Sequence, residues 1–100
     1  MAINQIIAEH SRLCILRALN EQPGYDLNDS IICDILKSYS LKCGRDELHT
    51  HLSWLERNGY VTIEKIGQSS TWVSTITPSG IDVAEGTIVV PGIKRPSPRG

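Results

Sequence analysis

The chain has 100 residues, of which 40% are hydrophobic, and its 10 Lys and Arg side chains nearly balance 11 Asp and Glu side chains. This length fits one domain with a modest hydrophobic core and excludes a two-domain enzyme. The net charge of −1 excludes a uniformly basic coat for nucleic acid, so any nucleic-acid interface must be local.

Hydrophobic periodicity predicts two helices in the first 40 residues. Apolar side chains recur at three- and four-residue steps over residues 3–21, and Pro23-Gly24 ends the pattern. Asn28 is the predicted N-cap of a second helix that ends near Ser38.

A third helix is predicted over residues 45–58, because Asn58-Gly59 is a strong C-terminal stop. A helical wheel puts Leu48, Leu52 and Leu55 on one buried seam. Polar side chains lie on or beside the opposite arc, where they could donate to base edges and phosphates. These candidate DNA contacts are Arg45, His49, Thr50, Ser53 and Arg57.

Two β-rich segments within residues 60–77 predict a hairpin with a polar tip. The tip suits phosphate or minor-groove contact, and it suits equally an ordinary solvated turn. Its candidate DNA contacts are Lys65, Gln68, Ser69 and Ser70. Thr77-Pro78 then predicts the start of a short helix that Gly86 ends.

Residues 87–100 differ in composition from the rest of the chain. They are rich in Pro and Gly and carry a charge of +3, against −4 for residues 1–86, which hold seven basic and eleven acidic groups. We expect a domain over 1–86 and an extended basic arm over 87–100. Lys94 and Arg95 are candidate contacts to a DNA backbone, whereas Val89 to Ile93 are expected to pack on the domain or on a second subunit.

This order of elements predicts a mainly α fold with a β-hairpin, of the winged helix-turn-helix type: a three-helix core, a two-stranded wing and a short C-terminal helix. The run Leu48–Val61 resembles the helix-to-wing junction of ArsR-like, MarR-like and PadR-like bacterial regulators, and Thr75–Gly80 resembles their exit from the wing. The chain also resembles small proteins of Mu-like bacteriophages that are labelled ArsR-family regulators. The matching segments are Tyr25–Ser30, Arg45-Asp46, Trp54-Leu55, Gly80–Gly86 and Val90–Pro96.

The resemblance implies a cytoplasmic phage regulator or accessory factor that binds double-stranded DNA, with helix 45–58 in the major groove and the hairpin 60–77 as the wing. We expect a homodimer built on the first helix and the C-terminal segment. Asp46 and Glu47 argue the other way, because they put negative charge at the end of the helix that would approach DNA. A winged helix used as an adaptor for a phage or host protein, without DNA binding, is therefore the alternative.

Other classes of function find little support. Three cysteines are an odd number, and their spacing fits no usual metal-ligand pattern, so neither a disulfide framework nor a metal site is expected. No catalytic motif is present, and no enzyme activity or cofactor is expected. No apolar run approaches the roughly 20 residues of a membrane span, and no membrane role is expected.

Overall fold

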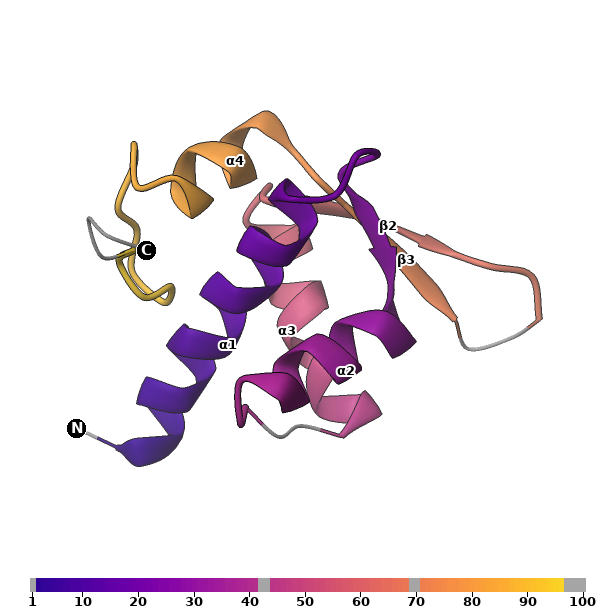
Figure 1. The fold of residues 1–100 in the computed structure, drawn as a ribbon, viewed down its shortest axis with the longest axis horizontal. Coiled ribbons are helices and arrows are strands. Elements are labelled where there is room, and N and C mark those ends of the chain that lie inside the picture. The colour runs from indigo at the N-terminus through magenta and orange to yellow at the C-terminus, as the bar shows by residue number, and fades with distance from the viewer. Residues whose placement is uncertain (1, 42–43, 69–70, 97–100) are drawn as a thin grey trace.

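A computed structural model describes residues 2–41, 44–68 and 71–96 of the chain. Within them the fold is a mixed α and β domain, with four helices and one antiparallel three-stranded sheet (Figure 1). In chain order the elements are α1 (Ile3–Asn20), β1 (Asp26–Asn28), α2 (Asp29–Ser38), α3 (Arg45–Arg57), β2 (Val61–Lys65), β3 (Trp72–Ile76) and α4 (Pro78–Ala84).

The helix ends follow local sequence signals, and the four predicted helices are confirmed to within a residue or two. The Asn28 side chain accepts a hydrogen bond from the Ile31 amide at 2.9 Å and caps α2. Thr77 caps α4 by accepting from the Gly80 amide at 3.1 Å, and Pro78 follows at the first helical position. After α3 the chain turns at Gly59, whose φ of +82° suits a residue without Cβ.

The core lies where α1, α2 and α3 meet one face of the sheet. The predicted seam of α3 is confirmed, since Leu48, Leu52 and Leu55 are fully buried. Their main partners are equally buried side chains of α1 and α2, namely Ile15, Leu16, Leu19, Ile32 and Leu36. Burying the seam turns the opposite face of α3 outward.

The prediction of a two-stranded hairpin was incomplete, because the sheet has a third strand. β1 pairs with β3 on the side away from β2, which gives the strand order β1, β3, β2. Three residues are too few to show alternation, so the sequence pattern could not reveal β1. Tyr25, with φ of +60°, reverses the chain after α1 and feeds it into this pairing.

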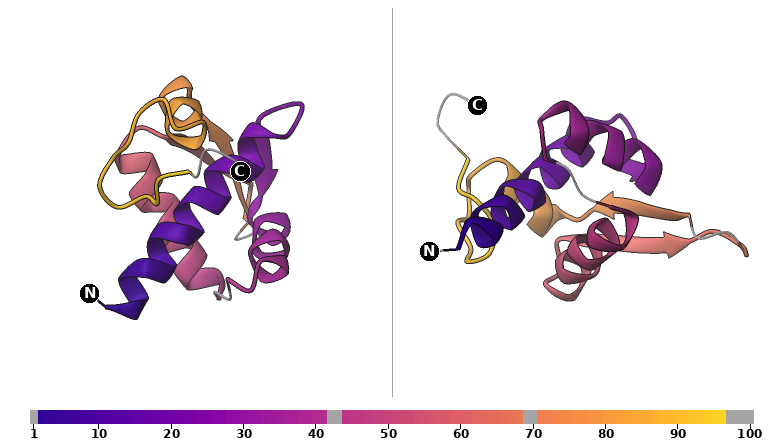
Figure 2. Two further views of the ribbon diagram at one scale, coloured as in Figure 1. Left: turned by 60° about the vertical axis from the view of Figure 1, so that its left-hand side comes forward. Right: turned by 90° about the horizontal axis from the view of Figure 1, so that it is seen from below.

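The described part of the segment that follows α4, residues 87–96 of the expected extended basic arm, packs against the domain. Ile93 is 5% exposed and belongs to the hydrophobic core. The Lys94 amide donates to the Glu9 carbonyl of α1 at 3.2 Å. The views of Figure 2 show this segment folded back beside α1. The expected packing of Val89 to Ile93 on the domain is thus confirmed for Ile93.

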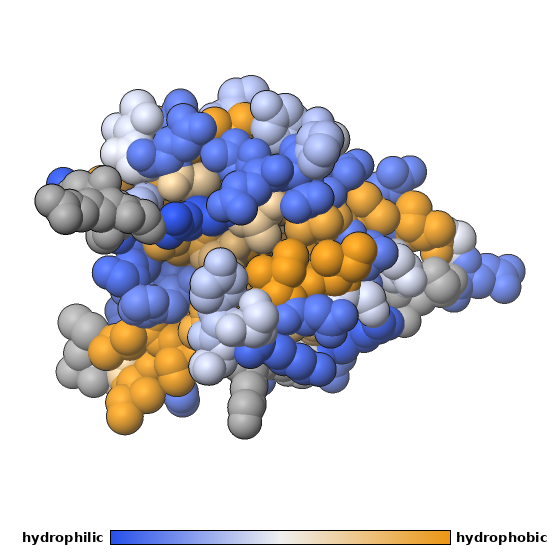
Figure 3. All heavy atoms as spheres, in the orientation of Figure 1, coloured by the Kyte–Doolittle hydropathy of each residue, from blue (hydrophilic) through white to orange (hydrophobic). Residues whose placement is uncertain are grey.

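The first two turns of α1 extend beyond the other helices and expose apolar side chains. Ile3, Ile6 and Ile7 are 73%, 39% and 42% exposed. They account for the orange area at the lower left of Figure 3, where the first turns of α1 lie in Figure 1. None of the helices in the described ranges is long and apolar enough to cross a membrane.

Candidate nucleic-acid interface

The hairpin of β2 and β3 extends away from the helices, and α3 packs directly on β2 (Figures 1 and 2). The Glu56 carboxylate of α3 accepts a hydrogen bond from the Ile63 amide of β2 at 3.2 Å. The exposed face of α3 and the projecting hairpin therefore lie next to each other. Together they form the candidate interface.

Most of the predicted contacts on α3 lie on its outer face. Arg45, Thr50 and Arg57 are exposed, and Ser53 is half-buried. The Thr50 hydroxyl donates to the Asp46 carbonyl one turn earlier, at 3.0 Å, so its proton is used within the helix and its lone pairs remain to accept. Arg45 and Arg57 stand at opposite ends of α3, about 18 Å apart along the axis.

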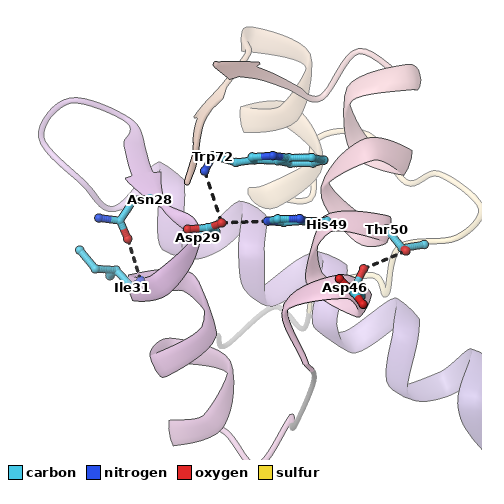
Figure 4. Close-up of polar contacts among 7 residues, drawn as sticks. All are labelled: Asn28, Asp29, Ile31, Asp46, His49, Thr50 and Trp72. Carbon is cyan, nitrogen blue, oxygen red and sulfur yellow. Dashed lines mark hydrogen bonds and ion pairs between the residues drawn. The ribbon is translucent and has the colours of Figure 1, made fainter. Parts of the chain in front are cut away.

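His49 is placed differently from the other candidates on α3. Its Nε2 lies 2.8 Å from Oδ2 of Asp29, and its side chain is only 17% exposed. Because an ionised carboxylate can only accept, Nε2 must carry the proton and donate it. The imidazole also stacks on Trp72, with 3.8 Å between ring centroids and 2° between planes (Figure 4). His49 thus joins α3 to α2 and β3, and Nε2 is not free to meet a base.

Asp29 is the polar centre of this arrangement. Its side chain is 1% exposed, and Oδ2 also accepts from the Trp72 amide at 3.3 Å. Burial raises the pKa of the Asp29 carboxyl, but the hydrogen bonds from His49 and the Trp72 amide, with the charges of Arg45 and His49, outweigh burial and hold the pKa below its usual value. Asp29 is therefore a charged structural link between α2, α3 and β3.

On the hairpin, Lys65 and Gln68 are exposed as predicted, while Ser69 and Ser70 lie outside the described residues. The Lys65 ammonium lies 4.8 Å from the centroid of the Trp72 ring, within cation–π range. The chain of contacts from Asp29 through His49 and Trp72 to Lys65 was not predicted. Its members are far apart in sequence, and the only local signal was an acidic residue in the first turn of α2.

A second polar cluster joins α1, α3 and the C-terminal segment. The Arg12 guanidinium lies 4.3 Å from the centroid of the Trp54 ring and donates to the Gly92 carbonyl at 2.8 Å. His51 is 9% exposed, and its Nδ1 has no hydrogen-bond partner among the residues that the structure describes. Burial lowers the pKa of His51, and the charge of Arg12 lowers it further, against an opposite effect of Glu47. The cluster holds the C-terminal segment in place.

Lys94 and Arg95 are exposed on that segment, but the segment and the hairpin lie towards opposite ends of the molecule's long axis, which measures 40 Å (Figure 1). The predicted DNA contacts therefore divide into two groups, one on α3 and the hairpin and one on the C-terminal segment. No three His, Cys, Asp or Glu side chains converge as a metal site in the part of the chain that the structure describes.

The chain is similar to two proteins from a phage and a bacterium. It is 40% identical over 97 residues, 97% of its own length, to the uncharacterized protein gp26 of Escherichia phage Mu, 98% of which is covered. It is 44% identical over 77 residues to an uncharacterized protein of Haemophilus influenzae, with 77% of this chain and 74% of that protein covered. No family model and no solved structure matches the chain.

Proposed function

We propose that this chain, which belongs to the same family as gp26 of Escherichia phage Mu, is a winged-helix protein that binds double-stranded DNA as a small regulator or accessory factor. The observation that carries the proposal is the projecting β2–β3 hairpin beside the outward face of α3. In this reading α3 enters the major groove and the hairpin is the wing.

The connectivity supports the winged-helix assignment. Two helices joined by a short connection, α2 and α3, are followed by the hairpin, and β1 between α1 and α2 completes the sheet beside β3. This is the order expected when a helix-turn-helix is followed by a wing. The link from Asp29 through His49 to Trp72 would hold the wing at a fixed angle to α3.

The side chains of the interface suit contact with a duplex. Arg57 can approach phosphates, and Thr50 and Ser53 offer small polar groups to base edges. Lys65 and Gln68 extend the polar surface onto the wing. Lys94 and Arg95 would touch a separate stretch of backbone. A homodimer would double this limited positive surface and present two copies of α3 about one helical turn apart, roughly 34 to 36 Å.

An amide chemical-shift titration of the isotopically labelled chain with a short duplex tests the proposal. Amides of α3 and of the described part of the hairpin should shift together, while those of α4 should not. Shifts confined to the C-terminal segment, or no shifts at low salt, would contradict it.

A protein adaptor is the second candidate function, and one feature favours it. Asp46 and Glu47 are both exposed in the first turn of α3, on a domain of negative charge. This acidic end would suit a basic segment of a protein partner better than a phosphate backbone. A folded chain that does not bind DNA in the titration but binds a Lys- and Arg-rich peptide through α3 would favour the adaptor function.

A further inference from the structure

One face of α1 has exposed apolar side chains near its start and borders a groove farther along. Near its start the face presents Ile3, Ile6 and Ile7, which we name the isoleucine stripe. No charged side chain occurs in residues 2–8. Further along, the same face borders a groove. On a helical wheel Ile3, Ile7 and Cys14 fall within about 40° of one another, so the stripe and the groove share one face.

The groove runs between α1 and the end of α2 and has a volume of about 600 Å³. Apolar and polar side chains both line it. The apolar lining residues are Leu13, Cys14, Ala18, Ile35, Tyr39 and Leu41, and the polar ones are His10, Arg17, Glu21, Gln22 and Ser38. Tyr39 is 68% exposed at the rim, whereas Tyr side chains are on average partly buried.

We propose that two copies of the chain pair through antiparallel α1 helices, with the isoleucine stripe of each copy seated in the α1–α2 groove of the other. The pairing has two-fold symmetry, so the stripe of each copy occupies the groove of the other copy. Because both features lie on one face of one straight helix, both contacts form at once. The assembly closes as a dimer rather than growing into a filament.

The register of the pairing follows from the positions of the two features along α1. Centring the stripe on the groove puts Ile7 beside the partner's Cys14 and Ile3 beside the partner's Ala18. The start of α1 then lies near the partner's Glu21, which borders the same groove. α1 has neither a side-chain cap nor an acidic residue in its first turn, so its unpaired amides would face a carboxylate.

A second copy fits the stripe better than DNA or a strongly charged protein does. An uncharged stripe has no attraction for a polyanion, and it can enter the groove of a second copy without like-charge repulsion. The contact would extend along about 27 Å of helix, which is short, so we expect a reversible dimer. The biological role of this dimer rests on the proposed function. The dimer itself should form without DNA.

Sedimentation without DNA, at protein concentrations from about 1 to 200 µM, tests the pairing. Wild type should sediment as a monomer–dimer equilibrium, and Ile7→Asp should weaken the dimer at least tenfold without loss of helical circular dichroism. Ile31→Asp is the matched control, since Ile31 has a similar exposure of 44% but lies on α2 outside the groove. A wild-type monomer throughout, or equal effects of the two variants, would overturn the proposal.

A cross-link tests the register. In a Cys33→Ala, Cys43→Ser background, Ile7→Cys should form a disulfide with Cys14 of the second copy on oxidation. The reaction is run at alkaline pH, because burial raises the pKa of the Cys14 thiol. Within one chain the two positions are about 10.5 Å apart along the helix, too far for a disulfide. Ile31→Cys in the same background should give no such bond, and a wild-type dimer without the bond at position 7 would overturn the antiparallel register.

The dimer and the proposed DNA binding can fail separately. A dimer that does not bind DNA would support the pairing and contradict the proposed function. A monomer that binds DNA contradicts the pairing alone.

Discussion

The imidazole of His49 lies flat against the indole of Trp72, with 3.8 Å between the ring centroids. His49 belongs to α3 and Trp72 opens β3, so this stack joins the helix to the hairpin. Asp29 completes the link, because its carboxylate accepts hydrogen bonds from both the imidazole and the Trp72 amide (Figure 4). A site built from side chains of α3 and the hairpin depends on this fixed relationship.

Asp29→Ala should lower the free energy of unfolding by about 3 kcal/mol, because it removes two hydrogen bonds to a buried charge. Urea unfolding followed by tryptophan fluorescence measures the change. Asp34→Ala is the control, since Asp34 is exposed on the same helix and its loss should cost less than about 0.5 kcal/mol. Equal effects of the two changes would mean that Asp29 is not a structural link.

Because His51 is buried, the folded chain should lose stability in mild acid. Its pKa is lowered in the folded state, so the unfolded chain binds the proton more readily as the pH falls below about 6.5. The free energy of unfolding should therefore fall between neutral pH and the lowered folded pKa. His51→Gln should flatten this part of the curve. An unchanged slope in this variant would assign the effect to another group.

Gly92 should be sensitive to an added side chain. A Cβ there would lie 2.6 Å from the Trp54 ring, and φ is +90°. Gly86 is a matched control, because its φ is +81° but a Cβ would make only ordinary contacts with Pro96. Gly86→Ala should cost about 1 kcal/mol from backbone strain, and Gly92→Ala about 2 to 4 kcal/mol from strain and overpacking. Equal costs in chemical unfolding would show that the segment does not depend on this contact.

The interface on α3 and the hairpin predicts that Arg57→Ala and Lys65→Gln weaken DNA binding without unfolding the chain. Together they should reduce the slope of log affinity against log salt by about 2, one for each phosphate contact. Lys37→Ala should leave the slope unchanged, since Lys37 is an exposed cation on α2 outside the interface. A slope that responds equally to all three changes would indicate diffuse attraction rather than this interface.

Local signals in the sequence were sufficient for the helices and the hairpin. Asn28, Thr77 and Gly59 each mark an element end through hydrogen bonds or dihedral angles that involve only nearby residues. β1 was missed because three residues form a strand only when β3 is beside them. Strand pairing at this distance in sequence leaves no periodic pattern.

The candidate site was predictable only in part. The helical wheel correctly predicted that Arg45, Thr50 and Arg57 are exposed, because the buried leucine seam fixes the rotation of α3 about its axis. It could not reveal that His49 has partners on α2 and β3, since those contacts arise from tertiary packing. Packing of Val89 to Ile93 was expected, but the sequence left open whether they pack on the domain or on a second subunit, and the folded chain places Ile93 in the domain core.

Binding of the full chain to a labelled duplex across a salt series is the most direct test of whether this protein binds DNA. A chain cut at Gly86 would lose the core residue Ile93, so the contribution of the C-terminal charges is measured instead with Lys94→Ala and Arg95→Ala. We expect an affinity that falls steeply with salt, and a smaller loss of affinity from these two changes than from Arg57→Ala with Lys65→Gln. A folded chain that does not bind at low salt would contradict DNA binding.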